Sequence, residues 1–178
     1  MTVHYLQPFA IDKDICKAYN EACRLIPKAD WICITDYDTM FLHHEQKVLI
    51  EQVVKSGQAD LYGAITNRCN VPECLLPSMF EELNIKKHYE KAVQRLKFGT
   101  QTTPHTGPIP GYFMLFSKDT WSRSGGFTIP QYGVNYAFDQ YFSQKVKRKA
   151  IIKGVYLLHL YRIWSGAPTV DFEHLKKT

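Results

Sequence analysis

The sequence predicts a single α/β domain in which helices flank a central, mostly parallel sheet. Strand-like and helix-like segments alternate from the N-terminus to about residue 66, which is the order typical of this class. The run at 31–35, Trp-Ile-Cys-Ile-Thr, is apolar at nearly every position, as in a strand that is buried on both faces. A chain of 178 residues with 45% hydrophobic side chains can bury one substantial core but not two, so we expect one domain over residues 1–178.

The first strand and helix are predicted from local spacing. Residues 3–9 alternate loosely up to Pro8, which favours a strand that runs into a loop. Apolar side chains then recur at helical intervals, with Asp12 or Asp14 available as the N-cap and Pro27 ending the run. An amphipathic helix therefore precedes the buried strand at 31–35.

The middle of the chain contains a second helix, a further strand and an insertion. The pattern predicts a helix over 43–56 with Gly57 as its stop, and a strand over 61–66. Residues 69–110 hold five prolines and one clear helical pattern, at 79–96, which a Ser78-x-x-Glu81 capping box would open. We expect this stretch to be a helical and loop insertion in the domain.

The core resumes after the insertion. We expect a strand over 111–116, a short helix over 118–124 that Gly125 and Gly126 interrupt, a helix carrying an aromatic stripe from 138 to 146, and a strand over 155–160. Alternating strands and helices thus continue to the end of the pattern, in agreement with the α/β class.

Cysteine usage and hydropathy indicate the compartment. None of the five cysteines forms a C-x-x-C pair, so the sequence predicts neither a disulfide framework nor a zinc ribbon, and a reducing cytoplasm fits best. There is no run of about 18 apolar residues and no basic-then-apolar leader. We therefore expect a cytoplasmic protein with no transmembrane segment.

The net charge of +5 is gathered into two basic clusters. Such surfaces attract anions, including a diphosphate, an acidic acceptor, nucleic acid or an anionic membrane surface. The alternative for each cluster is an ordinary solvated helix surface. The members are Lys86, Lys87, Lys91, Arg95 and Lys97 in one cluster, and Lys145, Lys147, Arg148, Lys149 and Lys153 in the other.

Two aspartates follow the buried strand directly. Asp36 and Asp38 are spaced i, i+2, so both carboxylates point the same way beyond the carboxyl end of the strand, where open α/β sheets bind ligands. Carboxylate oxygens suit Mg²⁺ or Mn²⁺, and such an ion would hold the phosphates of a nucleotide. This spacing also occurs in caps and turns, but the apolar residues on both sides favour a ligand site.

Six segments carry a further pattern. They are Lys-Ala-Tyr-Asn at 17–20, Asp-Trp-Ile-Cys-Ile-Thr-Asp-Tyr-Asp-Thr-Met-Phe at 30–41, Gly-Pro-Ile-Pro-Gly-Tyr-Phe-Met-Leu-Phe at 107–116, Trp-Ser-Arg-Ser-Gly-Gly-Phe at 121–127, Phe-Asp at 138–139 and His-Leu-Tyr-Arg at 159–162. In this order they resemble family-2-like GT-A glycosyltransferases over most of the chain apart from about 69–106. The resemblance implies a GT-A, Rossmann-like sandwich. It also implies transfer of a sugar, with inversion, from a nucleotide-diphospho-sugar such as a UDP- or GDP-sugar to a hydroxyl of a glycan or other acceptor.

The resemblance assigns roles to the residues that match. Asp36 and Asp38 would hold the divalent cation that bridges the donor diphosphate, with His159 as a third ligand. Asp139 falls where the family carries an acidic residue on a helix, and it is the candidate base. Asn20, Asn67, Arg68, Gly111 and Arg162 are the expected donor and acceptor contacts.

Two of these assignments have structural alternatives. A single histidine on a strand can serve packing alone, which applies to His159. Asp139 lies between Phe138 and Gln140 instead of in the family's usual acidic pair, and an aspartate at a helix start can be a simple cap.

The chain departs from the family at its N-terminal side, and this leaves other functions open. Only one strand and one helix precede Asp36, so the base pocket would have to come from residues 7–14 and Asn20. One alternative is a sugar-nucleotide nucleotidyltransferase, which would carry a glycine-rich loop after its first strand, whereas residues 7–14 contain no glycine. Another is a non-catalytic, degenerate GT-A domain that binds glycan or nucleic acid through the basic helices.

Overall fold

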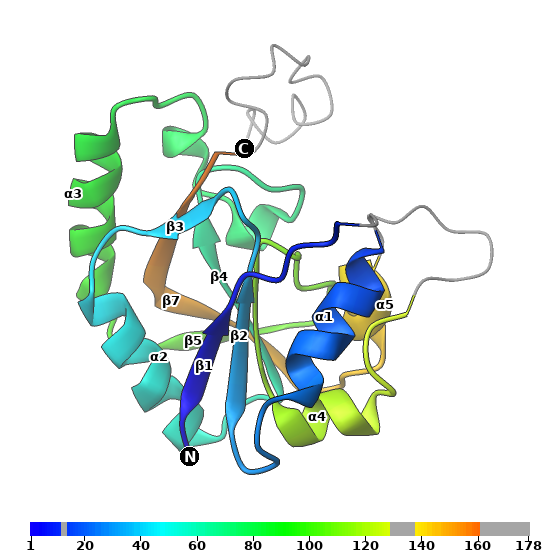
Figure 1. Ribbon diagram of the computed structural model, residues 1–178. Coiled ribbons are helices and arrows are strands. Elements are labelled where there is room, and N and C mark those ends of the chain that lie inside the picture. Colours follow the sequence, from blue (N-terminus) through cyan, green and yellow to red (C-terminus); the bar gives the residue numbers. More distant parts are fainter. Residues whose placement is uncertain (12–13, 129–137, 161–178) are drawn as a thin grey trace.

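The protein, seen here as a computed structural model that describes residues 1–11, 14–128 and 138–160, is built on one seven-stranded sheet (Figure 1). The strand order is β1-β2-β6-β4-β7-β3, with β5 beside β7. Figure 1 shows α1, α4 and α5 on one side of the sheet and α2 and α3 on the other. The strands are β1 Val3–Leu6, β2 Trp31–Thr35, β3 Thr39–Phe41, β4 Leu61–Thr66, β5 Thr102–His105, β6 Phe113–Ser117 and β7 Lys149–His159.

The helices of the described residues match the predicted positions with one exception. They are α1 Ile15–Arg24, α2 Glu45–Ser56, α3 Ile85–Leu96, α4 Lys118–Arg123 and α5 Phe138–Gln144, with short 3₁₀ turns at Pro72–Cys74 and Pro77–Met79. Asp14 caps α1 by accepting a hydrogen bond from the Lys17 N–H at 2.9 Å. Gly57 ends α2 in the left-handed conformation, at φ 62°, as predicted from its place after the helix.

The predicted start of α3 is wrong. The helix begins at Ile85, and the Asn84 side chain caps it by accepting from the Lys86 N–H at 2.9 Å. The proposed box at Ser78 instead falls in the 3₁₀ turn at Pro77–Met79. Asn84 is as good an N-cap as serine, and Pro77 starts a separate turn, so the helix opens later.

The α/β class is confirmed, but the sheet is mixed and not mostly parallel. The pairs β1·β2 and β4·β7 are parallel. Strand β6 runs antiparallel between β2 and β4, and β3 and β5 run antiparallel to β7. The sequence could not reveal this, because the apolar run of β6 reports burial on both faces and is independent of strand direction.

The predicted insertion at 69–110 is built into the core. It contains the expected helix, but it also supplies strand β5 and buried apolar side chains. Pro104 sits in β5, at a sheet edge where a missing N–H can be tolerated. Cys74, Met79, Phe80, Ala92 and Ile109 all belong to the single cluster of buried side chains that fills the domain.

Strand β7 bends sharply, and this bend shapes the upper edge of the sheet (Figure 1). Its pairing with β4 jumps from Ala64↔Ile152 to Ile65↔Tyr156, which leaves 153–155 as a bulge, and bulges bend strands. Gly154 lies at the bend, where an added Cβ would stand 2.2 Å from the Gly99 carbonyl oxygen. The bent end of β7 then pairs with β3, with Thr39 opposite His159.

Two predictions from composition can be compared with the structure. All five cysteines are buried with free thiols. Among the described residues, no helix combines the length and apolar character that a membrane span requires.

Candidate metal centre

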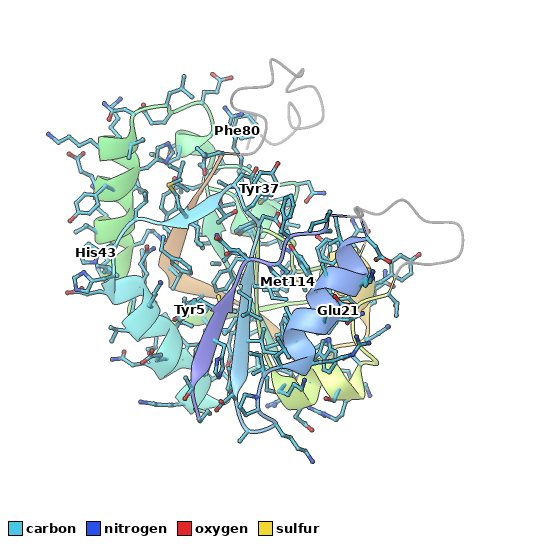
Figure 2. All side chains as sticks on the ribbon, viewed as in Figure 1. Tyr5, Glu21, Tyr37, His43, Phe80 and Met114 are labelled. Atoms are coloured by element: carbon cyan, nitrogen blue, oxygen red, sulfur yellow. The ribbon has the colours of Figure 1, made fainter. Side chains whose placement is uncertain are left out.

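Asp36, Asp38 and His159 come together at the carboxyl end of β2. Each offers one ligand atom, and these atoms all lie within 4.8 Å of one another. The turn at 36–38 joins β2 to β3 and carries both carboxylates, and β3 pairs with the end of β7, so Asp38 Oδ1 lies 3.4 Å from His159 Nε2. Between the two aspartates, Tyr37 is 86% exposed and projects at the end of the sheet (Figure 2).

The tautomer of His159 follows from its hydrogen bond. Nδ1 lies 2.7 Å from the Arg68 carbonyl oxygen, and a carbonyl only accepts, so Nδ1 carries the ring proton. In the neutral ring, Nε2 then presents its lone pair towards Asp38. Histidines that ligate metals are commonly held in this way, with the other ring nitrogen donating to a backbone carbonyl.

Asp36 is the more enclosed of the two carboxylates. It accepts a hydrogen bond from the Tyr19 hydroxyl at 3.3 Å. Burial raises its pKa, and the charge of Asp38 adds to this, while His159 and the Tyr19 bond act in the opposite direction. Two carboxylates in such a place repel each other, and a bound cation would relieve the repulsion.

Asp139 stands in the first turn of α5. Its Oδ2 accepts from the Gly111 N–H at 2.8 Å and its Oδ1 from the Gln140 N–H at 2.7 Å. Burial raises the pKa of Asp139 to about 6 and the charge of Asp36 adds to the rise, although the two backbone bonds oppose it. The carboxylate is therefore rigidly held and titrates in a range useful to a general base.

No protein-family model and no curated protein matches the chain. The interpretation of the site therefore rests on its own residues.

The donor set fits a hard divalent cation. Two ligand atoms that each lie about 2.0–2.2 Å from an ion can be about 4 Å apart across it, which is close to the spread of these three atoms. Two carboxylates and an imidazole suit Mn²⁺ or Mg²⁺ completed by water or phosphate oxygens.

Three of the predicted contact residues serve the framework of this site. Asn67 is fully buried and hydrogen-bonded to the backbone of His159. The Arg68 carbonyl accepts a hydrogen bond from the His159 ring, and the Arg68 side chain donates from Nε to the Phe80 carbonyl at 2.9 Å. Gly111 donates its N–H to Asp139.

Asn20, another predicted contact, makes three hydrogen bonds within the fold. The Asn20 Oδ1 accepts from the Phe127 N–H at 2.9 Å and from Trp121 Nε1 at 3.1 Å, and its Nδ2 donates to the Phe127 carbonyl. Asn20 thus ties α1 to the Gly126–Phe127 turn, and its role in ligand binding stays a prediction. Arg162 lies outside the described residues.

The metal turn is held by three residues for which the sequence predicts other places: Gln7 in the expected base-pocket loop at 7–14, and Tyr19 and Tyr112 within a helix and a strand. Gln7 Nε2 donates to the carbonyls of Asp36 and Thr39, at 3.4 and 3.3 Å. The Tyr112 ring stacks on that of His159 with centroids 5.3 Å apart, and its carbonyl accepts from the Asp36 N–H. Tyr19 and Tyr112 lie within the apolar patterns of a helix and a strand, and in the sequence their hydroxyl groups are the signal of a second role.

Proposed function

We propose that this chain is a metal-dependent GT-A glycosyltransferase. It transfers a sugar from a UDP- or GDP-sugar to a hydroxyl of a glycan or other acceptor, with inversion at the anomeric carbon. The observation that carries the proposal is the meeting of Asp36, Asp38 and His159 at the carboxyl end of a buried strand. The partly buried carboxylate of Asp139, whose pKa is raised by burial and by the charge of Asp36, supports it.

The roles follow from the chemistry of each group. Asp36, Asp38 and His159 hold Mn²⁺ or Mg²⁺, which when bound supplies Lewis-acid stabilisation of the leaving diphosphate. Asp139 accepts the proton of the acceptor hydroxyl as that oxygen bonds to the anomeric carbon and the bond from this carbon to the nucleoside diphosphate breaks. A carboxylate has about four lone-pair sites, and the two backbone N–H groups use only two of them.

A screen of nucleotide-sugars tests the proposal. Thermal unfolding of the protein with UDP-, GDP-, dTDP- and CDP-sugars, each with Mn²⁺ or EDTA, should give a rise in Tm for at least one donor that needs the ion. Turnover of that donor with an acceptor then separates the proposal from its alternatives. A degenerate binding domain would neither hydrolyse nor transfer the donor, and a nucleotidyltransferase would release pyrophosphate from a nucleoside triphosphate and a sugar phosphate.

Replacing His159 by alanine should weaken Mn²⁺ binding less than the loss of either aspartate. An imidazole binds a metal as the neutral ring, and water can take its place on a hard cation, whereas each carboxylate contributes a charge. Calorimetric titration of the three alanine variants with Mn²⁺ would rank them. Wild-type Mn²⁺ affinity in the His159 variant would leave this histidine a purely structural residue.

The proposal includes an anionic partner for the outer face of α3. Lys86 in the first turn and Lys97 at the C-cap are exposed there, while Lys87 is paired with Glu82. Beside them runs an apolar stripe in which Ile85, Tyr89 and Val93 are 62%, 45% and 40% exposed. Lysines beside exposed apolar side chains are typical of helices that rest on anionic membranes or acidic ligands. In the other basic cluster, Arg148 is paired with Asp60, and Lys149 donates to the Ser143 carbonyl.

The proposal also places the protein in the cytoplasm, because its free thiols fit a reducing compartment.

Charge reversal at Lys86 and Lys97 should weaken binding to vesicles that contain anionic lipid by about tenfold or more, because each basic residue near such a surface contributes about 1 kcal/mol. Sedimentation with vesicles of phosphatidylserine and phosphatidylcholine measures this. Reversal of Lys145 and Lys147 is the matched control, since it changes the net charge equally. An equal loss of vesicle affinity in both variants would contradict a specific role for α3. So would binding of the wild type to neutral vesicles as tightly as to anionic ones.

A further inference from the structure

The Asn67 side chain forms two hydrogen bonds to the backbone of His159. Its Oδ1 accepts from the His159 N–H at 2.8 Å, and its Nδ2 donates to the His159 carbonyl at 3.2 Å. The orientation of the amide is thereby fixed, because the N–H requires an acceptor and the carbonyl requires a donor. With the Arg68 carbonyl on Nδ1 at 2.7 Å, two consecutive residues make three hydrogen bonds to one histidine.

These bonds replace strand pairing at the point where it ends. The parallel ladder between β4 and β7 stops at Thr66↔Leu157. At this last pair, Thr66 also forms an isolated parallel bridge with Leu75, and its carbonyl accepts from the Leu76 N–H. The Asn67 side chain, which has no exposed surface, supplies the two bonds that a continuing strand would have given to His159.

We propose that Asn67 is a positioning residue of the metal centre, which holds the His159 backbone so that the Arg68 carbonyl fixes the ring proton on Nδ1 and Nε2 faces Asp36 and Asp38. The inference rests on the proposed function for its metal. It assigns to Asn67 a role different from direct contact with sugar or acceptor, for which a fully buried amide has no free surface. Groups that orient a metal-bound histidine typically affect metal affinity by about 10–100-fold.

A buried amide on α2 that also bonds to β7 provides the matched control. Gln46 is also fully buried, and its Nε2 donates to the carbonyl of Tyr156 on β7. Asn67→Ala and Gln46→Ala each remove one buried amide that bonds to β7, and only the first touches His159. We expect Mn²⁺ affinity, measured by calorimetry, to fall about tenfold or more in Asn67→Ala and to stay within about twofold in Gln46→Ala.

Equal losses of affinity in the two variants would overturn the inference, since both would then reflect a loosened strand. A second measurement requires no metal ion. Nitrogen-15 NMR of the histidine rings in the metal-free wild type should show His159 with its proton on Nδ1, and in Asn67→Ala, where it folds, a mixture of tautomers. A wild-type ring protonated on Nε2 would overturn the inference. Because this readout needs no ion, it decides the role of Asn67 separately from the proposed function, which fails if the wild type binds no Mn²⁺.

Discussion

Replacing Asp38 by alanine is expected to abolish Mn²⁺-dependent binding of the nucleotide-sugar while the fold survives. The Asp38 side chain is 21% exposed and faces His159 at the rim of the site, so it contributes little to the core. The bond from the Leu160 N–H to the Asp38 carbonyl belongs to the backbone and remains in the variant. Removal of one of two carboxylates takes away half of the negative charge that holds the ion.

Calorimetry with donor and Mn²⁺ measures this effect, and thermal unfolding checks the fold. Asp60→Ala is a suitable control, because Asp60 precedes β4 at the opposite end of the sheet and pairs with Arg148. Donor binding with an unchanged dependence on Mn²⁺ in the Asp38 variant would show that the ion, if any, is held elsewhere.

Replacing Asp139 by asparagine should lower transfer by about a hundredfold or more, the usual scale for a lost general base, while donor affinity stays near the wild-type value. The amide keeps the shape of the carboxylate but cannot accept the proton of the hydroxyl. It also accepts only one of the two backbone N–H bonds, from Gly111 and Gln140. The free energy of unfolding must therefore be measured alongside turnover.

The pH dependence of Asp139 separates a base from a helix cap. Its pKa is raised from the ordinary 3.8 to about 6, so turnover of the wild type should fall as the pH drops below about 6 and the carboxyl takes up its proton. The folded state binds this proton more tightly than the unfolded state. Stability linked to this group is therefore present below about pH 4 and is lost as the pH rises through 6.

Asp139→Asn should remove this slope in stability between about pH 4 and 6. Asp119→Asn is the control, because Asp119 lies on the exposed surface of α4 in an ion pair with Arg123. Transfer at close to the wild-type rate in the Asp139 variant would make Asp139 structural, and the base would have to be sought elsewhere or a retaining mechanism adopted.

Local patterns in the sequence predicted the elements that carry the site, and distant contacts account for what they missed. The bounds of β2 and β4 and the placement of Asp36 and Asp38 after a buried strand follow from hydrophobic runs alone. The resemblance predicts His159 as a third ligand, and in the structure its ring lies beside the two aspartates. Each of these depends on residues close together in the chain or on a known order of segments.

The role of Asn67 had no local signal. It depends on the bend in β7, on the point at which β4 leaves the ladder, and on a partner 92 residues away. Strand β3 is only three residues long, too short for an alternating pattern, and it forms because the bent end of β7 offers it an edge. The direction of each strand could not be predicted from the sequence either, because the same apolar residues can be buried in a parallel or an antiparallel strand.

The bend at Gly154 offers a fingerprint for recognising remote relatives. A side chain at this position would collide with the Gly99 carbonyl, so substitution would straighten or displace the strand and carry His159 away from the aspartates. A sequence that keeps this centre should therefore combine an Asp-x-Asp after an apolar run, an asparagine directly after the next long strand, and a glycine five positions before a histidine near the last strand's end. Chains with this spaced set could be grouped with the present one even when their overall identity is too low to align.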